Sequence, residues 1–310
     1  MQALRVGVIG AGHFGRFHAL KLAKAGVLAG LCDASPARAA AVAAEAGCPA
    51  LPLDGLIAAS DALVVAAPTA HHGSLGLAVL EAGRHLFIEK PIAATLEEAD
   101  RLIETAAARG LVLQVGHIER YSAAVATLRQ AAAGFAPRVI QATRIAPFRP
   151  RGLDVSVVLD LMIHDIDLVL SLAGEEPAAI AAVGGRIASA LPDYAVAELR
   201  FPSGLRAEIT ASRVAVAMER RLRMLGDGGE LRVDFLARSL SALRPGGAEP
   251  DPHLPGFGRD ALSWADHDSL EAEQAAFLRA IREGVPPEAD GRAGRAALAV
   301  ALAVERALGA

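Results

Sequence analysis

The chain has few of the features that mark secreted, membrane or nucleic-acid-binding proteins. Its two cysteines, Cys32 and Cys48, form neither a CxxC motif nor a disulfide framework, so we expect the reducing environment of the cytoplasm. No uninterrupted apolar run reaches the length of a membrane span, and no signal-peptide pattern opens the sequence. The net charge of −4 is spread without a basic block, which argues against nucleic acid or a membrane as partner and favours small molecules.

Aromatic residues are also scarce, at 4% of the chain, whereas charged residues are present at an ordinary 21%. With 53% apolar residues, this composition is typical of a globular α/β protein and excludes a disordered or collagen-like chain. A length of 310 residues is too great for one small core and predicts two domains.

The first part of the chain, residues 1–118, alternates short apolar runs with helix-length segments such as 36–46 and 96–109. The apolar runs predict strands at residues 4–9, 28–33, 62–67, 85–89 and 111–116. Their near-continuous hydrophobicity indicates that helices cover both faces of the sheet. We therefore predict a doubly wound parallel sheet, which is the Rossmann fold, for this domain.

The second predicted domain, residues 119–310, is richer in strands. Helices are predicted at 121–133, 155–172, 269–283 and 291–308, and strands at 138–146, 179–187, 195–201, 205–212, 220–225 and 230–235. Short turns between successive strands indicate an antiparallel meander, with helix 155–172 on one face and the other face in need of a cover. Residues 245–258 are rich in proline and glycine and predict a surface loop. The expected fold class is α/β, with an α+β second domain whose sheet is large, mostly antiparallel and open-faced.

A glycine-rich loop, Gly10-Ala11-Gly12-His13-Phe14-Gly15, follows the first predicted strand and opens a helix-forming stretch. The first glycine permits a tight turn, the second lets the backbone approach a pyrophosphate, and the third allows close packing of helix and strand. The free N–H groups and dipole of the helix N-terminus then stabilise phosphate charge. The alternative is a glycine turn that binds no ligand. The context favours a dinucleotide site that includes His13 and Phe14.

An acidic residue, Asp33, ends the second predicted strand, where it can accept hydrogen bonds from the ribose diol of the cofactor's adenosine. This position favours NAD. Ser35 and Arg38 follow closely and are able to bind a 2′-phosphate, so NADP remains the alternative cofactor. A role for Asp33 as a helix cap also stays open, although Ser35-Pro36 is better placed to begin a helix.

The tripeptide Glu89-Lys90-Pro91 lies at the carboxyl end of the fourth predicted strand, the edge at which open α/β sheets bind ligands. An ammonium group there can donate a hydrogen bond to a reacting hydroxyl or carbonyl oxygen. A solvated loop lysine is the alternative interpretation of Lys90. The proline that follows the lysine permits a cis peptide bond.

A second constellation lies in the predicted helix 155–172, where Asp160 and His164 are four residues apart and share a face. The carboxylate can orient the imidazole and raise its basicity, which suits removal of a proton from an alcohol as hydride leaves. An ordinary polar helix pair is the alternative. Asp165 and Asp167 project elsewhere and are predicted to be hydrogen-bonded structural acids.

Possible metal ligands are present, but no metal-binding signature joins them. They are His71, His72, His117, Asp160 and His164. The sequence has neither an HExxH motif nor paired CxxC motifs, and isolated histidines more often pack or hydrogen-bond than bind metal. We therefore expect no metal site.

Four motifs taken together identify a family. Gly10-x-Gly12-x-x-Gly15, Pro68-Thr69-x-x-His72, Glu89-Lys90-Pro91 and Asp160-x-x-x-His164 occur in this order over essentially the whole chain. They resemble the glucose-fructose oxidoreductase/inositol dehydrogenase/rhizopine-catabolism family, abbreviated Gfo/Idh/MocA. The resemblance implies a Rossmann domain and a second domain whose open-faced sheet often mediates oligomerisation, so a homodimer or homotetramer is expected.

The resemblance also implies residue roles. Lys90 and His164 would serve proton transfer and substrate binding, with Asp160 positioning the sugar and the histidine. The remaining cofactor contacts would come from Pro68, Thr69, His72, Glu89 and Gln114. The Lys90-Pro91 bond is often cis in such enzymes, and the active site is expected between the two domains.

Two segments, 115–121 and 158–167, resemble a subgroup that contains UDP-N-acetylglucosamine 3-dehydrogenases, although Tyr121-Ser122 stands where that subgroup commonly has Phe-Asn. Arg120 and Tyr121 are candidate substrate contacts. Arg149 and Arg151 are candidates to bind a diphosphate or sugar carboxylate, with solvated loop residues as the alternative.

The leading hypothesis is hydride transfer between a nicotinamide cofactor and a secondary alcohol or ketone of a sugar or nucleotide sugar, with the 3-position of a UDP-N-acetylglucosamine-like substrate preferred. An inositol or free-aldose dehydrogenase of the same family is one alternative. A dinucleotide-binding regulatory protein without turnover is the other.

Overall fold

The computed structural model describes residues 4–150, 153 and 155–309. The chain packs as two compact units: Met1–Ile118 with Asp268–Leu298 form unit 1, and Glu119–His267 with Ala299–Ala310 form unit 2. The division from sequence assigned everything after residue 118 to the second domain, whereas the structure places residues 268–298 with the first core.

Unit 1 contains a five-stranded sheet in the order β2-β1-β3-β4-β5, with every pair of neighbours parallel. The strands are β1 (Val6–Ile9), β2 (Leu28–Cys32), β3 (Ala62–Val65), β4 (His85–Glu89) and β5 (Leu113–Gly116). Every residue of β1, β3 and β5 is buried, which explains why β1 and β3 carry no polar side chain and β5 carries only one, that of Gln114. The predicted Rossmann sheet is confirmed.

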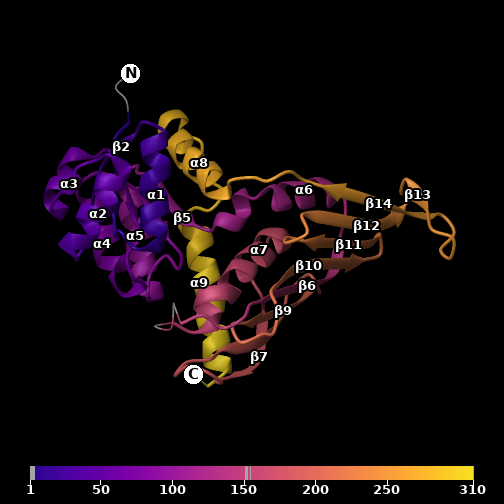
Figure 1. Cartoon of the computed structure of the whole chain (residues 1–310). Coiled ribbons are helices and arrows are strands. Elements are labelled where there is room, and N and C mark those ends of the chain that lie inside the picture. Colours follow the sequence, from indigo (N-terminus) through magenta and orange to yellow (C-terminus); the bar gives the residue numbers. More distant parts are fainter. Residues whose placement is uncertain (1–3, 151–152, 154, 310) are drawn as a thin grey trace. The chain divides into compact units, whose positions relative to one another are not determined.

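Three of the helices of unit 1, which Figure 1 labels, begin at a side-chain cap. Ser35, Thr95 and Asp268 each accept a hydrogen bond from a first-turn N–H group of the helix that follows. The helices are α1 (His13–Lys24), α2 (Pro36–Ala46), α3 (Leu53–Ala59), α4 (His72–Glu81), α5 (Leu96–Ala108) and α8 (Ser269–Glu283).

Helix α8 belongs to unit 1 because its apolar face completes the first core. Phe277 is buried, and its ring centroid lies 5.7 Å from that of Phe87 in β4. Lys21 pairs with Asp268, and Lys24 Nζ lies 3.1 Å from a carboxylate oxygen of Glu271, so α1 and α8 are also joined by ion pairs. The helical period of this segment predicts an apolar face but does not reveal which core that face will join.

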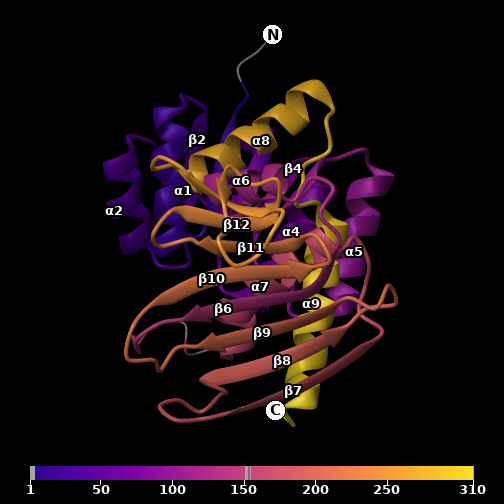
Figure 2. The same cartoon turned by 90° about the vertical axis from the view of Figure 1, so that its right-hand side faces the viewer.

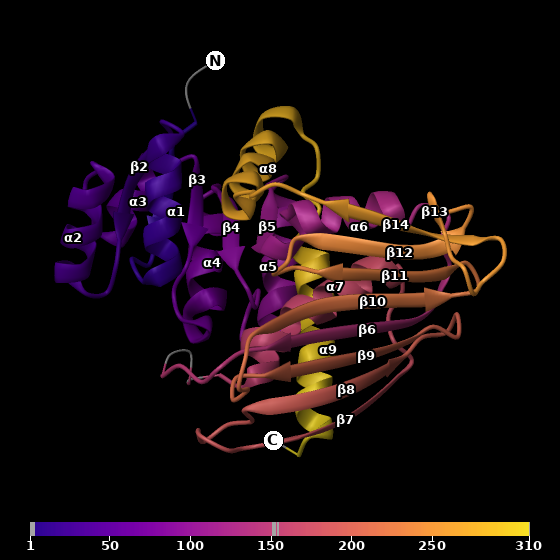
Figure 3. The same ribbon diagram turned by 45° about the vertical axis from the view of Figure 1, so that its right-hand side comes forward.

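Unit 2 contains a nine-stranded sheet in the order β13-β14-β12-β11-β10-β6-β9-β8-β7 (Figure 3). The strands are β6 (Pro137–Ile145), β7 (Ala179–Gly185), β8 (Tyr194–Arg200), β9 (Arg206–Ser212), β10 (Glu219–Gly226), β11 (Gly229–Asp234), β12 (Ser239–Pro245), β13 (Glu249–Pro250) and β14 (Phe257–Ser263). The mostly antiparallel sheet is confirmed, but the simple meander is wrong. β6 lies between β9 and β10 and is parallel to β9.

The prediction of a surface loop at residues 245–258 is only partly correct. Its middle forms β13, and its end enters β14, which pairs with both β12 and β13. A Cβ added to Gly258 would lie 2.2 Å from the carbonyl oxygen of Gly247, so the glycines that suggested a loop permit a close backbone approach at the edge of the sheet.

One face of this sheet is covered by helices of unit 2. α6 (Ala123–Ala131) contacts β11 and β12. The π-helical turn Val158–Met162 contacts β9, and α7 (Ile163–Ala173) contacts β6 and β9. α9 (Gly291–Ala307) begins in unit 1 and ends in unit 2. Figure 2 shows the opposite face, over which no helix of the described part of unit 2 lies.

A buried carboxylate, Asp193, fixes the turn between β7 and β8. Its oxygens accept hydrogen bonds from the N–H groups of Ile187, Ala188 and Ser189, and from Arg213 Nε at 2.9 Å. Burial by itself raises the pKa of this carboxyl, but the backbone donors, Ser189 and Arg213 lower it well below its ordinary value. The ionised carboxylate is therefore the form that the fold prefers.

The depressed pKa predicts an acid-sensitive contribution to stability. It is present above the ordinary aspartate pKa and is lost as the pH falls from about 4 toward the lower pKa of the folded protein. Asp193→Asn should flatten this acid dependence in urea unfolding and, at neutral pH, lower the free energy of unfolding by about 1–3 kcal/mol. Asp227→Asn, at an 85%-exposed side chain, is the matched control. Parental stability of Asp193→Asn at neutral pH would contradict the prediction.

Candidate active site

The three glycines of the loop after β1 meet three different constraints. Gly10 has a φ of +99°, and a Cβ there would lie 2.5 Å from the carbonyl oxygen of Ala66. A Cβ on Gly15 would lie 1.8 Å from the carbonyl oxygen of Gly10, so only glycine lets α1 pack this closely. Gly12 begins α1 without a side-chain cap, and a Cβ added to it would meet nothing within 4 Å. Its absent side chain leaves space beside the first-turn N–H groups, which is the cradle that a pyrophosphate requires.

Asp33 is tied to this loop. Its Oδ2 accepts a hydrogen bond from Ala11 N at 2.7 Å, and its Oδ1 accepts one from Ser35 N at 2.8 Å. The N-cap residue of α2 is Ser35 rather than Asp33. The exposed guanidinium of Arg38 lies 3.6 Å from Asp33 Oδ1. Asp33 and Arg38 therefore lie together beside the glycine loop.

Lys90 follows β4 at the carboxyl edge of the parallel sheet, the same edge as the glycine loop. The Lys90-Pro91 peptide bond is cis, as expected. The short 3₁₀ helix Thr69–His71, which Pro68 precedes, follows β3 at this edge too. The structure thus brings Gly10, Pro68 and Lys90 to one end of one sheet.

His72 and Gln114 are predicted cofactor contacts whose side chains are held by the backbone of unit 1. His72 is 1% exposed, with Nδ1 2.7 Å from the carbonyl oxygen of Pro91 and Nε2 2.8 Å from that of Ala67. Burial lowers the pKa of this imidazole, and the two carbonyls oppose that shift. Gln114 is fully buried, and its Nε2 donates to the carbonyl oxygen of Glu273 at 3.0 Å. His72 therefore joins the segments that follow β3 and β4, and Gln114 joins β5 to α8.

In unit 2, Asp160 lies in the π-helical turn and His164 in the first turn of α7. Both are half-buried, whereas Met162, Ile163 and Asp165 between and beside them are buried. This alternation places the acid and the imidazole on the more accessible side of the helix. A π turn often marks a functional position, because it widens the helix locally and redirects side chains.

Two arginines, the buried Arg144 and the largely buried Arg120, hold the acids that follow His164. Arg144 Nε lies 2.7 Å from Asp165 Oδ2, and its Nη1 lies 2.8 Å from a carboxylate oxygen of Glu119. Arg120 makes a bidentate pair with Asp167, at 2.7 and 2.6 Å. Asp165 and Asp167 are therefore structural acids, as the sequence suggested. The predicted substrate contact Arg120 is itself largely buried in this pair.

Sequence reasoning missed Arg144 and Glu119. The available signal was the presence of two acids in an otherwise apolar helix, since buried carboxylates require cationic partners. Of the other predicted substrate contacts, Tyr121 is half-buried at the end of the 3₁₀ helix Ile118–Tyr121, and Arg149 is exposed after β6. Arg151 lies outside the described residues.

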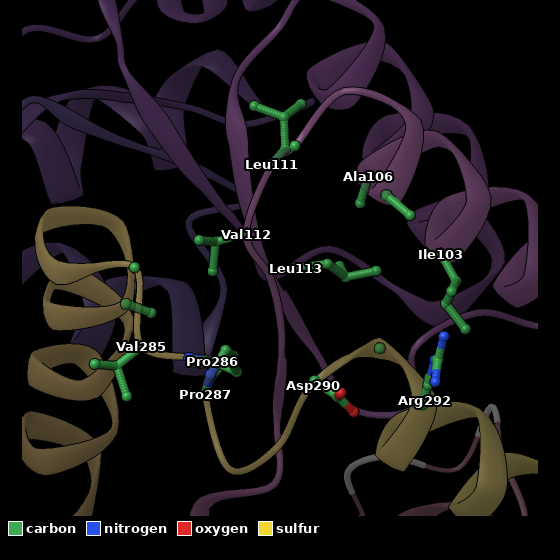
Figure 4. Close-up of a pocket in the computed structure, with 15 residues that line it drawn as sticks. Ile103, Ala106, Leu111, Val112, Leu113, Val285, Pro286, Pro287, Asp290 and Arg292 are labelled. Atoms are coloured by element: carbon green, nitrogen blue, oxygen red, sulfur yellow. The ribbon is translucent and has the colours of Figure 1, made fainter.

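Unit 1 also contains a pocket of about 330 Å³ (Figure 4). Leu111, Val112 and Leu113 at the beginning of β5 line it, together with Val285, Pro286 and Asp290 from the connection between α8 and α9. It is therefore at the amino edge of the sheet, opposite Lys90.

In the described ranges, no three histidines, cysteines or acids form a metal-binding group, and no helix is long and apolar enough to span a membrane.

Comparison with known families supports the geometry of both units. Residues 4–117 match the oxidoreductase family with an NAD-binding Rossmann fold, and residues 122–232 match the GFO/IDH/MocA C-terminal domain. The chain belongs to the Gfo/Idh/MocA family. Three predictions are confirmed: the family, the activity as an NAD-binding oxidoreductase and the fold class.

Members of the Gfo/Idh/MocA family resemble this chain over its full length. UDP-N-acetylglucosamine 3-dehydrogenase of Acidithiobacillus ferrooxidans is 45% identical over 99% of this chain and 98% of that protein. A solved structure of that enzyme superposes with a TM-score of 0.94 at the same coverage. Myo-inositol 2-dehydrogenase of Thermotoga maritima is 28% identical over 98% of this chain and 96% of that protein.

The loop geometry of this Gfo/Idh/MocA enzyme predicts that one alanine substitution affects cofactor affinity and another affects stability. Gly12→Ala should keep the parental unfolding temperature but weaken NADH binding at least about tenfold, because the new methyl group fills the cradle. Gly15→Ala should instead lower stability, since its Cβ would lie 1.8 Å from Gly10 O. NADH fluorescence titration and thermal unfolding measure the two effects. Gly55→Ala, whose Cβ would make ordinary contacts at 3.5 Å, is the control. Unchanged affinity in Gly12→Ala would contradict the assignment.

Proposed function

We propose that this enzyme uses NAD⁺ to oxidise a secondary hydroxyl of a nucleotide-linked sugar, with the 3-hydroxyl of UDP-N-acetylglucosamine as the leading substrate. The observation that carries the proposal is 45% identity over 99% of the chain to a dehydrogenase of that name. The presence of Lys90, Asp160 and His164 supports turnover over a regulatory role without chemistry.

The chemistry supplied by a bound nicotinamide is acceptance of a hydride. The Lys90 ammonium donates a hydrogen bond to the reacting oxygen, and the His164 imidazole takes the hydroxyl proton. The Asp160 carboxylate orients that imidazole and stabilises its protonated form. The same groups act in the reverse direction, with His164 returning the proton during ketone reduction.

The choice of lysine at position 90 supports its role as a proton-handling group. Only three of the 31 Lys and Arg residues in the chain are lysines. Lys21 and Lys24 pair with acids of α8. Lys90 is the third lysine, and it stands at the carboxyl edge of the parallel sheet. An ammonium carries three donors on a flexible stem, whereas a guanidinium presents a rigid planar fork, so arginine would not replace lysine at this position.

Replacement of Lys90 by methionine keeps much of the side-chain volume and removes the charge. Lys90→Met should lower kcat/KM for UDP-N-acetylglucosamine by about 10²–10⁴-fold and leave the Kd for NAD⁺ within about twofold of the parent. Turnover is followed by NADH absorbance. Lys24→Met, at a 73%-exposed side chain, is the matched control. Full activity in Lys90→Met would overturn the catalytic assignment.

The same assay distinguishes the alternative substrates when UDP-N-acetylglucosamine is compared with myo-inositol and free aldoses. A higher kcat/KM for myo-inositol than for the nucleotide sugar would make myo-inositol the preferred substrate, in line with the 28% identity to an inositol dehydrogenase. Absence of turnover on the whole panel would favour a regulatory protein. Running NADP⁺ beside NAD⁺ tests the exposed Arg38 as a 2′-phosphate contact.

We further propose that the enzyme is cytoplasmic, in keeping with its two free cysteines, and forms a homodimer or homotetramer through the open face of the unit 2 sheet. On that face, Val183 of β7 pairs with Val196 of β8, and Val183 is 68% exposed. Exposed apolar side chains on a sheet face favour association.

A charged substitution on this face should break the assembly. In sedimentation velocity, Val183→Lys combined with Val196→Lys should shift the enzyme to a smaller species, because two unpaired charges would be buried at each contact. The matched control is Val216→Lys, a fully exposed position on the connection between β9 and β10. A parental sedimentation coefficient in the double variant would exclude this face as the interface.

A further inference from the structure

The carboxylate next to Lys90 has both of its oxygens engaged. Glu89 Oε1 accepts a hydrogen bond from His18 Nε2 at 2.8 Å, and Oε2 accepts one from the backbone N–H of Lys90 at 3.3 Å. A Cβ added to Gly116 in the neighbouring strand would lie 2.7 Å from Oε2, so the carboxylate occupies the space that this glycine leaves. Glu89 is thus held between α1, β5 and the backbone of Lys90.

The His18 ring is fixed in turn by a residue of α8. Gln274 Nε2 lies 2.9 Å from His18 Nδ1 and 3.3 Å from the carbonyl oxygen of the same residue. An amide nitrogen only donates, so Nδ1 is the acceptor and the ring proton is on Nε2, facing Glu89. The fully buried ring also packs edge-on against Phe87, with centroids 5.0 Å apart. Both the orientation and the tautomer of the imidazole are therefore set.

This chain of groups keeps Glu89 ionised. Burial raises the pKa of the Glu89 carboxyl, but the His18 hydrogen bond and the nearby Lys90 outweigh burial and lower it overall. Buried polar chains of this kind contribute little net stability compared with apolar packing. They do restrict the groups they join to one geometry.

We propose that Gln274 and His18 are positioning residues, which act through Glu89 to fix the backbone of Lys90 and hence the direction of its ammonium. The inference rests on the proposed function, because it takes Lys90 as the group that binds the reacting oxygen. Neither residue belongs to the four motifs that identify the family. Their action links the helix of the pyrophosphate cradle and a helix near the C-terminus to one catalytic side chain.

Two substitutions of His18 separate positioning from packing. His18→Leu removes both hydrogen bonds, whereas His18→Gln keeps an amide donor and acceptor with the spacing of the two ring nitrogens. His18→Leu should lower kcat by about 10–10²-fold and leave the Kd for NAD⁺ within about twofold, because misdirected catalytic groups lose rate and not cofactor affinity. His18→Gln should recover most of kcat. His253→Leu, on an exposed turn, is the control.

A double-substitution cycle tests whether His18 acts through Lys90. In the Lys90→Met background, His18→Leu should change residual single-turnover activity less than about twofold. If Lys90→Met reduces activity and His18→Leu lowers it further by its full factor, the positioning role fails and the proposed function stands. If Lys90→Met alone keeps full activity, the catalytic role of Lys90 fails first.

Further outcomes would also overturn the inference. These are parental kcat in His18→Leu, an equal loss of kcat and NAD⁺ affinity, or no recovery in His18→Gln. Should His18→Leu not fold, Gln274→Leu takes its place, since it keeps the imidazole and removes the amide that donates to Nδ1 and to the carbonyl oxygen of His18. That variant should lower kcat with unchanged NAD⁺ affinity, and a parental kcat there would refute the proposal.

Discussion

The close approach of α1 to the end of β1 is the constraint on which the rest of unit 1 depends. The Cα of Gly15 packs against the carbonyl of Gly10 so closely that no other residue fits. This contact sets the uncapped N-terminus of α1 beside Gly12, where phosphate charge would be stabilised. One turn further along, the same helix carries His18 to Glu89. A single packing contact therefore places both the cofactor cradle and the residue that holds the neighbour of Lys90.

Features that depend on a short stretch of sequence could be predicted. The parallel strands are short, mostly apolar runs, the glycine loop lies between a strand and a helix, and the Lys90 and His164 motifs have fixed spacing. Long-range pairings could not be predicted this way. Gln274 and His18 are 256 residues apart, and no local pattern connects them. The position of β6 between β9 and β10 is likewise decided by the packing of the whole sheet.

The buried acids of α7 lie between these two cases. Asp165 and Asp167 interrupt an apolar helix, so their burial required cationic partners and the sequence indicated that partners exist. Their identity depended on the fold, because Arg144 comes from β6 and Arg120 from a short 3₁₀ helix. Sequence thus predicts the need for an ion pair more readily than it predicts the pair.

Two of the candidate catalytic groups, Lys90 and His164, each adjoin a residue whose side chain is locked. Glu89, before Lys90, is held by His18, and Asp165, after His164, is held by Arg144. Adjacent residues on a strand or helix point in different directions, so a locked neighbour fixes the backbone without occupying the space of the catalytic side chain. Lys90 and His164 are themselves only half-buried and keep access to a ligand. Glu89 and Asp165 thus hold the backbone rigid, while the neighbouring Lys90 and His164 keep their reacting atoms accessible. This arrangement suits groups that must move protons and keep their direction.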